Sequence, residues 1–391
     1  MSKKLHISLL ALAVSAASSS VLALEAASIK LADGLEFTPT LQVSERYDDN
    51  FREVERNEES SWITTIAPTF SLGAEGRKSA YKLSYTAVSD TFHSSHKDNN
   101  TDHHLTAGAG FEFDARNRLK LNAGYHDIEE TASVDQNVEN DMYNTKSVGG
   151  VYTFGAQSAR AQIDFGTNYE ELRYTNSNGL NADKERDTTA LRSTFYYRIA
   201  PKTKALLEGR YTDYDYTDTR GRGKNSDNTG LLAGLTWEAT AKTTGTAKFG
   251  REKKDFDDSR VGEKSTGMWE VGATWEPRTY SRFNLNTRRG FDEGEDNAST
   301  IKTQTTTLSW EHDWAERLTS NVSYTRSDRK YQDITREDKL DSFGIGLTYE
   351  MRRWLDVGIG YKYSENDSDA TPRNNESYKR NIYALTLNAS L

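Results

Sequence analysis

Four histidines stand close together in the first third of the chain, and their spacing could serve metal chemistry. The cluster, with the carboxylates between them, comprises His93, His96, Asp98, Asp102, His103 and His104. Imidazole and carboxylate groups are together competent metal ligands. The surrounding residues are polar, as in an exposed loop, where unliganded histidines are far more common. We therefore expect exposed histidines here and no metal.

Other chemical signatures are weak. A hydrolase built on this chain would need serine, histidine and acidic groups that converge, and no such pattern stands out. The sequence holds no cysteine, which excludes disulfides and thiolate metal sites. The basic stretch Arg220 to Lys224 includes two glycines but precedes no helix, so it does not resemble a phosphate-binding loop. We expect neither an enzyme nor a bound cofactor.

Acidic residues gather in several polar stretches. They include Asp255 to Asp258, Asp292 to Asp296 and Glu365 to Asp369. Such stretches are usually solvated loops that charge keeps soluble, although they could also hold divalent cations that bridge to lipopolysaccharide. The formal net charge of −9 argues against nucleic-acid binding, which normally requires a basic face.

The remaining charged side chains fall at regular places in alternating segments, on the stripe opposite the apolar residues. The basic set is Lys82, Lys120, Arg160, Arg210, Lys248, Arg282, Arg288, Arg326 and Lys362. The acidic set is Glu112, Glu238, Glu270, Glu311 and Glu350. If the apolar stripe faces lipid, these side chains line a lumen. They could brace the wall as ion pairs, or leave a field that orients charged solutes.

The segments that carry these residues alternate between short and long connections. Short turns such as 114–117 and 200–203 follow one strand, and long polar connections such as 216–228 follow the next. This alternation is typical of transmembrane β-barrels, with tight periplasmic turns and long outer loops. Eighteen strands are expected, beginning near residues 35, 62, 81, 105, 119, 146, 161, 190, 205, 231, 246, 268, 283, 303, 318, 343, 355 and 378.

Apolar alternation sets the expected register. From Phe343 to Tyr349 the odd positions are apolar or aromatic, while the even ones are small or charged; Leu355 to Tyr363 repeats this pattern. Successive side chains of a strand point to opposite faces, so each set forms one stripe.

Aromatic residues recur once per hairpin, just before the short turns, and would form a periplasmic girdle. They are Phe113, Phe154, Tyr197, Trp237, Trp275, Trp310 and Tyr349. Tyrosines on the other strands would contribute to an outer girdle, namely Tyr85, Tyr125, Tyr169, Tyr211, Tyr324 and Tyr363. The repeat of about 40 residues also suits a propeller. A propeller blade, however, needs four short strands per repeat, whereas each repeat of this sequence contains two long ones.

The two ends of the chain carry further signals. Residues 1–23 read as a signal peptide, with Lys3 and Lys4 before an apolar run and a small-residue cleavage site. Residues 24–34 would form a short periplasmic segment and residues 35–391 the barrel. The last strand would present a C-terminal assembly signal of Tyr383, Leu385, Leu387 and Leu391, although outer-membrane barrels commonly end in an aromatic residue.

Composition agrees with this architecture. Only 35% of the residues are hydrophobic, too few for several packed cores, while aromatics reach 11%, too many for disorder. A barrel places lipid on one face of each strand and polar groups on the other.

Three early segments also resemble a known family. They read LEFTPTLQVSERYDDN at 35–50, WITTIAPTFSL at 62–72 and YKLSYTA at 81–87. This pattern is similar to the putative β-barrel porin 2 family of outer-membrane proteins. The resemblance implies an outer-membrane barrel without catalytic residues and, for some members, a role in exopolysaccharide or capsule export.

The expected function is therefore that of an outer-membrane conduit, with an extracellular or capsular polysaccharide as the favoured cargo. The alternatives are a general or small-solute porin, and a non-conducting barrel that displays loops for surface or matrix attachment. The expected partners are outer-membrane lipid and lipopolysaccharide, the barrel assembly machinery, and a polysaccharide with its export apparatus.

Overall fold

The computed structural model of the protein describes residues 28–131, 139–218, 222–240, 242–295, 297–370 and 376–390. The described chain consists almost entirely of antiparallel strands. They are β1 (Ile29–Ala32), β2 (Leu35–Asp48), β3 (Ser61–Glu75), β4 (Ser79–Phe92), β5 (Asn100–Glu112), β6 (Asn117–Glu130), β7 (Asp141–Phe154), β8 (Ala161–Tyr174), β9 (Arg186–Ala200), β10 (Thr203–Tyr216), β11 (Ser226–Thr240), β12 (Thr243–Phe256), β13 (Glu263–Arg278), β14 (Ser281–Glu293), β15 (Thr300–Ala315), β16 (Leu318–Tyr331), β17 (Glu337–Arg352), β18 (Leu355–Ser368) and β19 (Tyr378–Ser390).

Short 3-10 turns lie in the connections, namely η1 (His96–Asp98), η2 (Ser177–Gly179), η3 (Ala182–Lys184) and η4 (Arg222–Lys224). Within the described ranges, no helix is long and apolar enough to cross a membrane.

The strands close into a barrel. Each strand from β2 to β19 pairs with the next, and β19 pairs with β2 from Ser390 opposite Thr40 to Ile382 opposite Asp48. The barrel wall therefore has eighteen strands, which confirms the predicted fold and strand count. Closure leaves no long unpaired edge in the wall.

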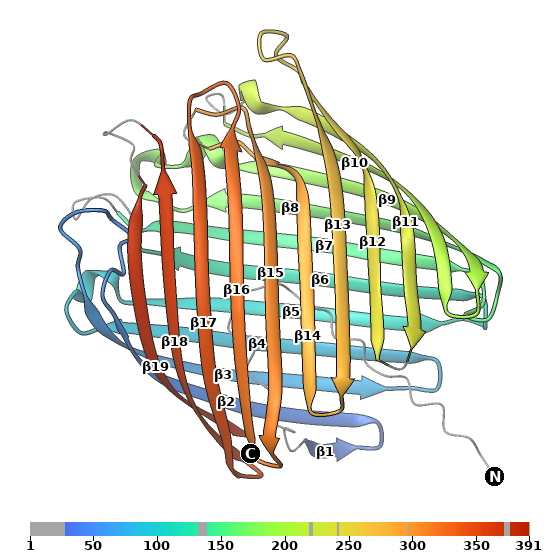
Figure 1. The fold of residues 1–391 in the computed structure, drawn as a ribbon, viewed down its shortest axis with the longest axis horizontal. Helices are drawn as coiled ribbons and strands as arrows, with labels where there is room; N and C mark the ends of the chain where they lie inside the picture. The colour runs from blue at the N-terminus through green and yellow to red at the C-terminus, as the bar shows by residue number, and fades with distance from the viewer. Residues whose placement is uncertain are drawn as a thin grey trace.

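The connections alternate in length as predicted. The short ones include 76–78, 113–116, 201–202, 316–317 and 353–354, and the long ones include 49–60, 175–185 and 217–225. In Figure 1 the long connections project toward the upper left and the short turns toward the lower right. The two kinds thus mark opposite rims, and the rim with the long connections is called the outer rim below.

Several strands are longer at the outer rim than the sequence predicts. β9 begins at Arg186, not near residue 190, and β17 begins at Glu337, not near residue 343. The prediction followed the apolar alternation, which stops where the lipid band stops. The hydrogen-bonded ladder continues beyond that point through polar residues.

A short strand precedes the barrel within the segment predicted to be a periplasmic extension. β1 forms a hairpin with β2 through Asp33 and Gly34, and pairs with residues 35–37 of β2. Gly34 has φ of 74°, and a β-carbon there would lie 2.4 Å from the carbonyl oxygen of Glu75, so the turn requires glycine. Because β19 ends opposite Thr40, β1 covers the edge of β2 that β19 leaves open. The predicted signal peptide lies outside the described residues.

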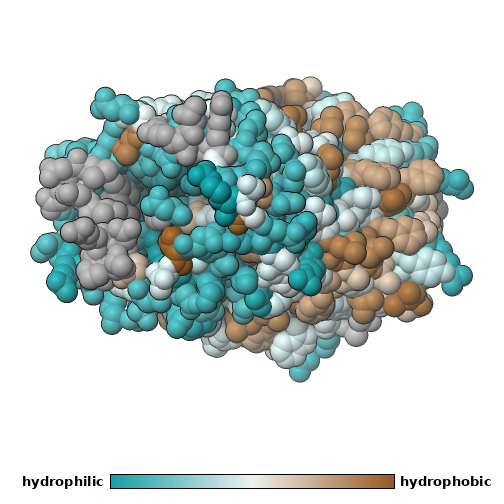
Figure 2. All heavy atoms as spheres, turned by 90° about the horizontal axis from the view of Figure 1, so that it is seen from above, coloured by the Kyte–Doolittle hydropathy of each residue, from teal (hydrophilic) through white to brown (hydrophobic). Residues whose placement is uncertain are grey.

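The register separates the two faces of the wall. Leu347 lies opposite Ile359, and Phe343 lies opposite Tyr363, so the apolar stripes of β17 and β18 form one continuous surface. These side chains are exposed in the isolated barrel, with Ile359 at 58%. In Figure 2 hydrophilic side chains cover the left of the molecule and hydrophobic ones gather on the right. The apolar face is therefore the outer face of the barrel, where lipid lies.

Glycines let the backbones of β11 and β12 approach each other closely. Gly234 and Gly250 lie on the inner face, and a β-carbon there would lie 2.0 Å from the Ala247 oxygen and 1.9 Å from the Leu231 oxygen, respectively. Only glycine permits so close an approach of neighbouring backbones.

Candidate functional site: the barrel lumen

The inner face of β9 to β15 surrounds a cavity of about 610 Å³. Charged and polar side chains that line it include Arg192, Glu208, Lys248, Glu270, Arg288 and Thr305. They occupy alternate positions to the apolar outer stripe, as the strand geometry requires. The cavity is thus part of the lumen.

Four of the charges on this wall form one network. Arg210 donates from its two terminal nitrogens to the two oxygens of Glu270, at 2.5 and 2.8 Å, and also contacts Glu208 at 2.5 Å. The Lys248 Nζ lies 2.6 Å from Glu270 and 3.3 Å from Glu208. Thr194 donates a further hydrogen bond to Glu208 at 3.0 Å. Two cations and two carboxylates therefore brace β10, β12 and β13 against one another.

Two further arginines add positive charge beside this network. Arg288 bonds to Asp292 at 2.6 Å, whereas Arg192 has no carboxylate within ion-pair distance among the described residues. In and beside the cavity, the four cations Arg192, Arg210, Lys248 and Arg288 stand against the three carboxylates Glu208, Glu270 and Asp292. These side chains therefore carry an excess of one positive charge.

Away from the charged sector, hydroxyl pairs line the inner wall. Neighbouring strands are joined on this face by Thr69 and Thr86 at 2.8 Å, Ser71 and Ser84 at 2.6 Å, Thr307 and Thr325 at 3.0 Å, and Ser342 and Ser364 at 2.7 Å. Each hydroxyl retains acceptor capacity beyond the bond to its partner. Much of the lumen therefore offers neutral hydrogen-bonding groups.

At the outer rim, the connection 49–60 reaches inside the mouth. Phe51 packs on Phe92 with ring centroids 5.2 Å apart, and both contact Ile63 on the inner face. The adjacent Arg52 is 3% exposed and bonds to Asp98 at 2.5 Å and Glu59 at 3.0 Å. A second cavity of about 310 Å³ lies beside this connection. The connection therefore packs against the inner face at the mouth, where the buried Arg52–Asp98 pair holds it.

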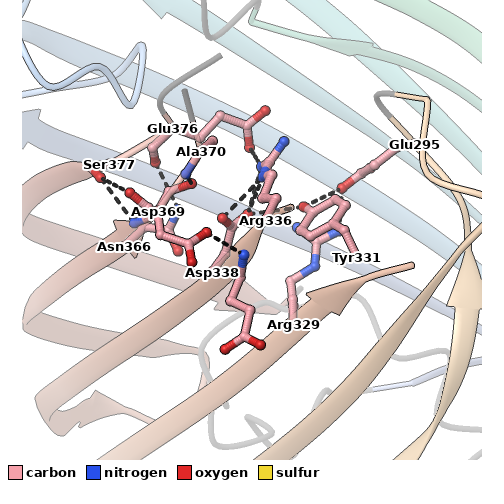
Figure 3. Close-up of polar contacts among 12 residues, drawn as sticks. Glu295, Arg329, Tyr331, Arg336, Asp338, Asn366, Asp369, Ala370, Glu376 and Ser377 are labelled. Atoms are coloured by element: carbon pink, nitrogen blue, oxygen red, sulfur yellow. Dashed lines mark hydrogen bonds and ion pairs between the residues drawn. The ribbon is translucent and has the colours of Figure 1, made fainter. Parts of the chain in front are cut away.

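A second buried network lies at the rim near β16 to β18. Figure 3 shows Arg336 between Asp338 and Glu376, to which it bonds at 2.6 and 2.5 Å. The hydroxyl of Tyr331 lies 3.0 Å from a carboxylate oxygen of Asp338 and of Glu295. Burial disfavours the charge of Arg336, but its hydrogen bonds to the carboxylates outweigh this effect and raise its pKa. This part of the rim is thus held by the ion pairs of Arg336 with Asp338 and Glu376.

Comparison with known proteins identifies the family. The family model of the putative beta-barrel porin 2 family matches residues 36–391. The chain belongs to this family. The predicted resemblance is therefore confirmed, and the protein is an outer-membrane barrel. Porin-like barrels of this kind are typically not enzymes. A search of curated proteins finds no match.

Solved structures resemble this porin-family barrel at low identity. OccAB2 of Acinetobacter baumannii is 11% identical with a TM-score of 0.50, and the match covers 91% of this chain and 98% of that one. OpdK of Pseudomonas aeruginosa, solved with vanillate, is 10% identical with a TM-score of 0.49, covering 90% and 98%. The FrpB iron transporter of Neisseria meningitidis is 11% identical with a TM-score of 0.47, covering 85% of this chain and 63% of FrpB. The likeness concerns the fold alone, and the barrel spans less than two thirds of FrpB.

Most of the charged residues predicted for the lumen of the porin-family barrel lie on inner-face positions. The structure places Lys82, Lys120, Arg210, Lys248, Arg282, Arg288, Lys362, Glu112, Glu238, Glu270, Glu311 and Glu350 there. Arg282 joins Glu276 at 2.8 Å and Glu311 at 3.2 Å near the short-turn rim. Lys82, Lys120 and Lys362 are exposed and have no carboxylate within ion-pair distance among the described residues.

Two of the lumen predictions are wrong. Arg326 lies opposite Thr306, two positions from Tyr324, and therefore shares the outer face with that tyrosine. Because residues two apart on a strand point to the same face, Tyr324 cannot point outward while Arg326 points inward. Arg160 precedes β8 in the connection 155–160, where its guanidinium lies 5.1 Å from the Tyr197 ring. It packs against an aromatic of the outer face and not along the lumen.

The residues predicted for the periplasmic girdle lie on outer-face positions near the short turns. Trp275, Phe283 and Trp310 form a stacked row with centroid distances of 5.2 and 6.0 Å. Phe113, Phe154, Tyr197, Trp237 and Tyr349 occupy corresponding positions on other strands or just beyond them. Tyr383, Leu385 and Leu387 of the predicted assembly signal are exposed on the same face, and Leu391 lies outside the described residues.

The histidines are distributed over both faces. His104 on β5 points inward and lies 2.9 Å from His126 on β6, measured between the Nδ1 atoms. His103 points outward and bonds to the hydroxyl of Tyr85. Among the described residues, no group of three or more histidine and carboxylate side chains is arranged to hold a metal ion.

Sequence reasoning missed two important inner-face residues and one buried residue of the connection 49–60. Glu208 and Arg192 have the same alternation as the predicted lumen residues, and Glu208 precedes Arg210 by two positions, which was the available signal. Arg52 was not predicted because its burial depends on how the connection 49–60 folds against Asp98.

Proposed function

We propose that this porin-family barrel conducts an extracellular or capsular polysaccharide across the outer membrane. The observation that carries the proposal is the composition of the inner wall, which combines hydroxyl pairs with a charged sector around the larger cavity. A polysaccharide presents many hydroxyl groups along its length. Many weak contacts with the wall suit passage, because binding must be strong enough for entry and weak enough for exit.

The charged sector would favour an acidic polymer. Four cations stand against three carboxylates in and beside the cavity, Asp292 included, so a uronic acid or other carboxylated sugar would find a small positive excess. The carboxylates in the network hold Arg210 and Lys248 in place, which keeps single sites from binding the polymer too tightly.

The outer mouth would require opening during transport. The connection 49–60 is fixed by Arg52, whose pairing with Asp98 is buried from solvent. A partner of the export apparatus, or the polymer itself, would have to displace this connection. This supports a gated conduit and not a permanently wide pore.

A small-solute porin is the second candidate. The cavity of about 610 Å³ is in the size range of sites for small molecules. A porin of this kind would pass a small carboxylated solute through the same charged sector without conducting a polymer. A third possibility is a non-conducting barrel that displays its outer connections.

Planar-bilayer conductance separates these functions. The purified barrel would be measured alone, then with a polyuronate and with neutral dextran of matched length. The conduit proposal predicts open channels, with transient blocks that are more frequent for the polyuronate than for dextran. The Arg52→Gln variant, which loosens the mouth, should open more often than the wild type.

The opposite results are equally informative. Conductance that responds to small carboxylates but never to either polymer would favour the small-solute porin. Absence of conductance in both the wild type and Arg52→Gln, with the barrel folded, would overturn both transport functions and leave the display function.

A further inference from the structure

A cluster of cations lies on the lipid-facing side of the barrel, away from the lumen. Arg251 on β12, Arg289 on β14 and Lys302 on β15 share the outer face with Phe249, Leu285 and Leu308, respectively. Arg289 lies opposite Trp269 and Gln304, and Lys302 follows diagonally from Arg289 across the β14–β15 pair. We call Arg251, Arg289 and Lys302 the outer basic patch.

The patch lies where the apolar belt ends toward the outer rim. Arg251 follows the exposed Phe249 by two positions on β12, and Lys302 is the third residue of β15. The guanidinium of Arg289 lies 5.1 Å from the ring of Trp269. Tryptophan and basic side chains concentrate at the level of lipid headgroups, where aliphatic stems contact acyl chains and charged ends reach the interface.

The charges of the patch lack compensation from the protein. Within the described part of the chain, no carboxylate lies within ion-pair distance of any of the three residues. Arg251 donates only to the hydroxyl of Ser265, at 2.8 Å. Lys302 lies directly opposite another cation, Lys330, whose Nζ pairs with Glu337, so Lys330 has a carboxylate partner while Lys302 has none among the described residues.

Three other outward cations near the same rim are paired, whereas the exposed Lys339 of β17 has no carboxylate within ion-pair distance among the described residues. Arg173 bonds to Asp187 at 2.5 Å, Arg326 to Asp341 at 3.2 Å, and Lys379 to Glu365 at 3.1 Å. The outer basic patch therefore differs from these three paired cations in charge balance, and from the lone Lys339 in bringing three unpaired cations together.

We propose that the outer basic patch binds the phosphate groups of a phosphorylated glycolipid in the outer leaflet of the membrane. The side chains face laterally, into the headgroup layer, so a membrane lipid reaches them more readily than a free aqueous anion. Arginine provides paired donors for phosphate, and lysine provides a point charge. Trp269 supplies an aromatic surface beside the headgroup. The protein thereby selects lipid neighbours around β12 to β15.

Native mass spectrometry tests this proposal. The folded barrel would be released from detergent after incubation with bisphosphorylated lipid A, with dephosphorylated lipid A, or with inorganic phosphate. The wild type should retain the bisphosphorylated lipid and not the other two. The variant Arg251→Gln/Arg289→Gln/Lys302→Gln should bind it about a hundredfold more weakly, because each basic side chain near a charged lipid surface contributes about a fivefold factor.

The matched control removes three paired cations near the same rim, as Arg173→Gln/Arg326→Gln/Lys379→Gln. It should retain lipid binding within about threefold of the wild type, since exposed ion pairs contribute little. If the patch variant fails to fold, Lys302→Gln alone carries the test, with an expected loss of about fivefold.

Equal binding by the wild type and the patch variant would overturn the proposal. Retention of the dephosphorylated lipid, saturation by inorganic phosphate, or an equal loss in the control variant would also overturn it, because each would show that phosphate on a membrane lipid is not what the patch selects.

Discussion

Neutralising Glu208 should weaken the barrel wall and change its selectivity together. Glu208 is 3% exposed and accepts hydrogen bonds from Arg210, Lys248 and Thr194. Glu208→Gln keeps the size of the side chain and one acceptor oxygen, but it removes the negative charge between the two cations. Arg210 and Lys248 would then share Glu270 alone.

The magnitude follows from the bonds that are lost. A hydrogen bond to a charged group contributes about 1.5–3 kcal/mol. Removing one partner of a buried ion pair costs about 3–5 kcal/mol when no other partner remains. Because Glu270 still contacts both cations, we expect a loss of about 2–3 kcal/mol in the free energy of unfolding. The lumen also gains one net positive charge, so anion preference should rise.

Equilibrium urea unfolding of the barrel in lipid vesicles, followed by tryptophan fluorescence, measures the first effect, and reversal potentials measure the second. Glu112→Gln is the matched control, since Glu112 is an inner-face glutamate without a cation in ion-pair distance among the described residues. A Glu208→Gln barrel as stable as the Glu112→Gln barrel, with an unchanged reversal potential, would refute the bracing role of the network.

Three further predictions concern lipid contact, topology and the mouth. Ile359→Arg should cost about 2–4 kcal/mol in folding free energy in vesicles, since its side chain lies in the apolar belt, whereas the inward Gly360→Ser should cost much less; equal costs would mean that the faces are inverted. A tag inserted at Gly223 should bind antibody on intact cells, and one at Gln157 only after permeabilisation; the reverse would overturn the topology. Arg52→Gln should accelerate proteolysis of the connection 49–60 in the folded barrel, because it leaves Asp98 buried without its cation; an unchanged rate would show that this pair does not fix the connection.

The architecture could be predicted because it depends on local patterns. The alternation of apolar and polar residues along β17 and β18, and the length of each connection, can be read from consecutive residues. Every strand shows the alternation, because one face of each strand contacts lipid. The register of Leu347 opposite Ile359 depends on the short turn at 353–354 together with a register shift between Glu350 and Arg352, which the alternation of both strands requires.

The charged network could be predicted only in part. The sequence shows that Arg210 and Glu270 share the inner face, but it does not show that they meet across β11 and β12. That contact joins β10 and β13 across two intervening strands, so it depends on the three-dimensional shape of the closed sheet and not on a local pattern. Burial of Arg52 likewise depends on the path of an irregular connection, for which no periodic signal exists.

The closing pair of strands has a consequence for how the barrel forms. Eighteen strands give seventeen pairings between sequence neighbours and one pairing between the chain's two ends. At that seam Arg380 bonds to Asp48, 332 positions away. The conformational entropy that is lost when such distant segments come together grows only with the logarithm of their separation. At the seam, however, the whole of this loss falls on one pairing step. Contact order is therefore low for every hairpin and very high for the seam, so ring closure is the natural kinetic bottleneck of folding. Until the seam closes, β2 and β19 remain two open edges that can pair with other chains.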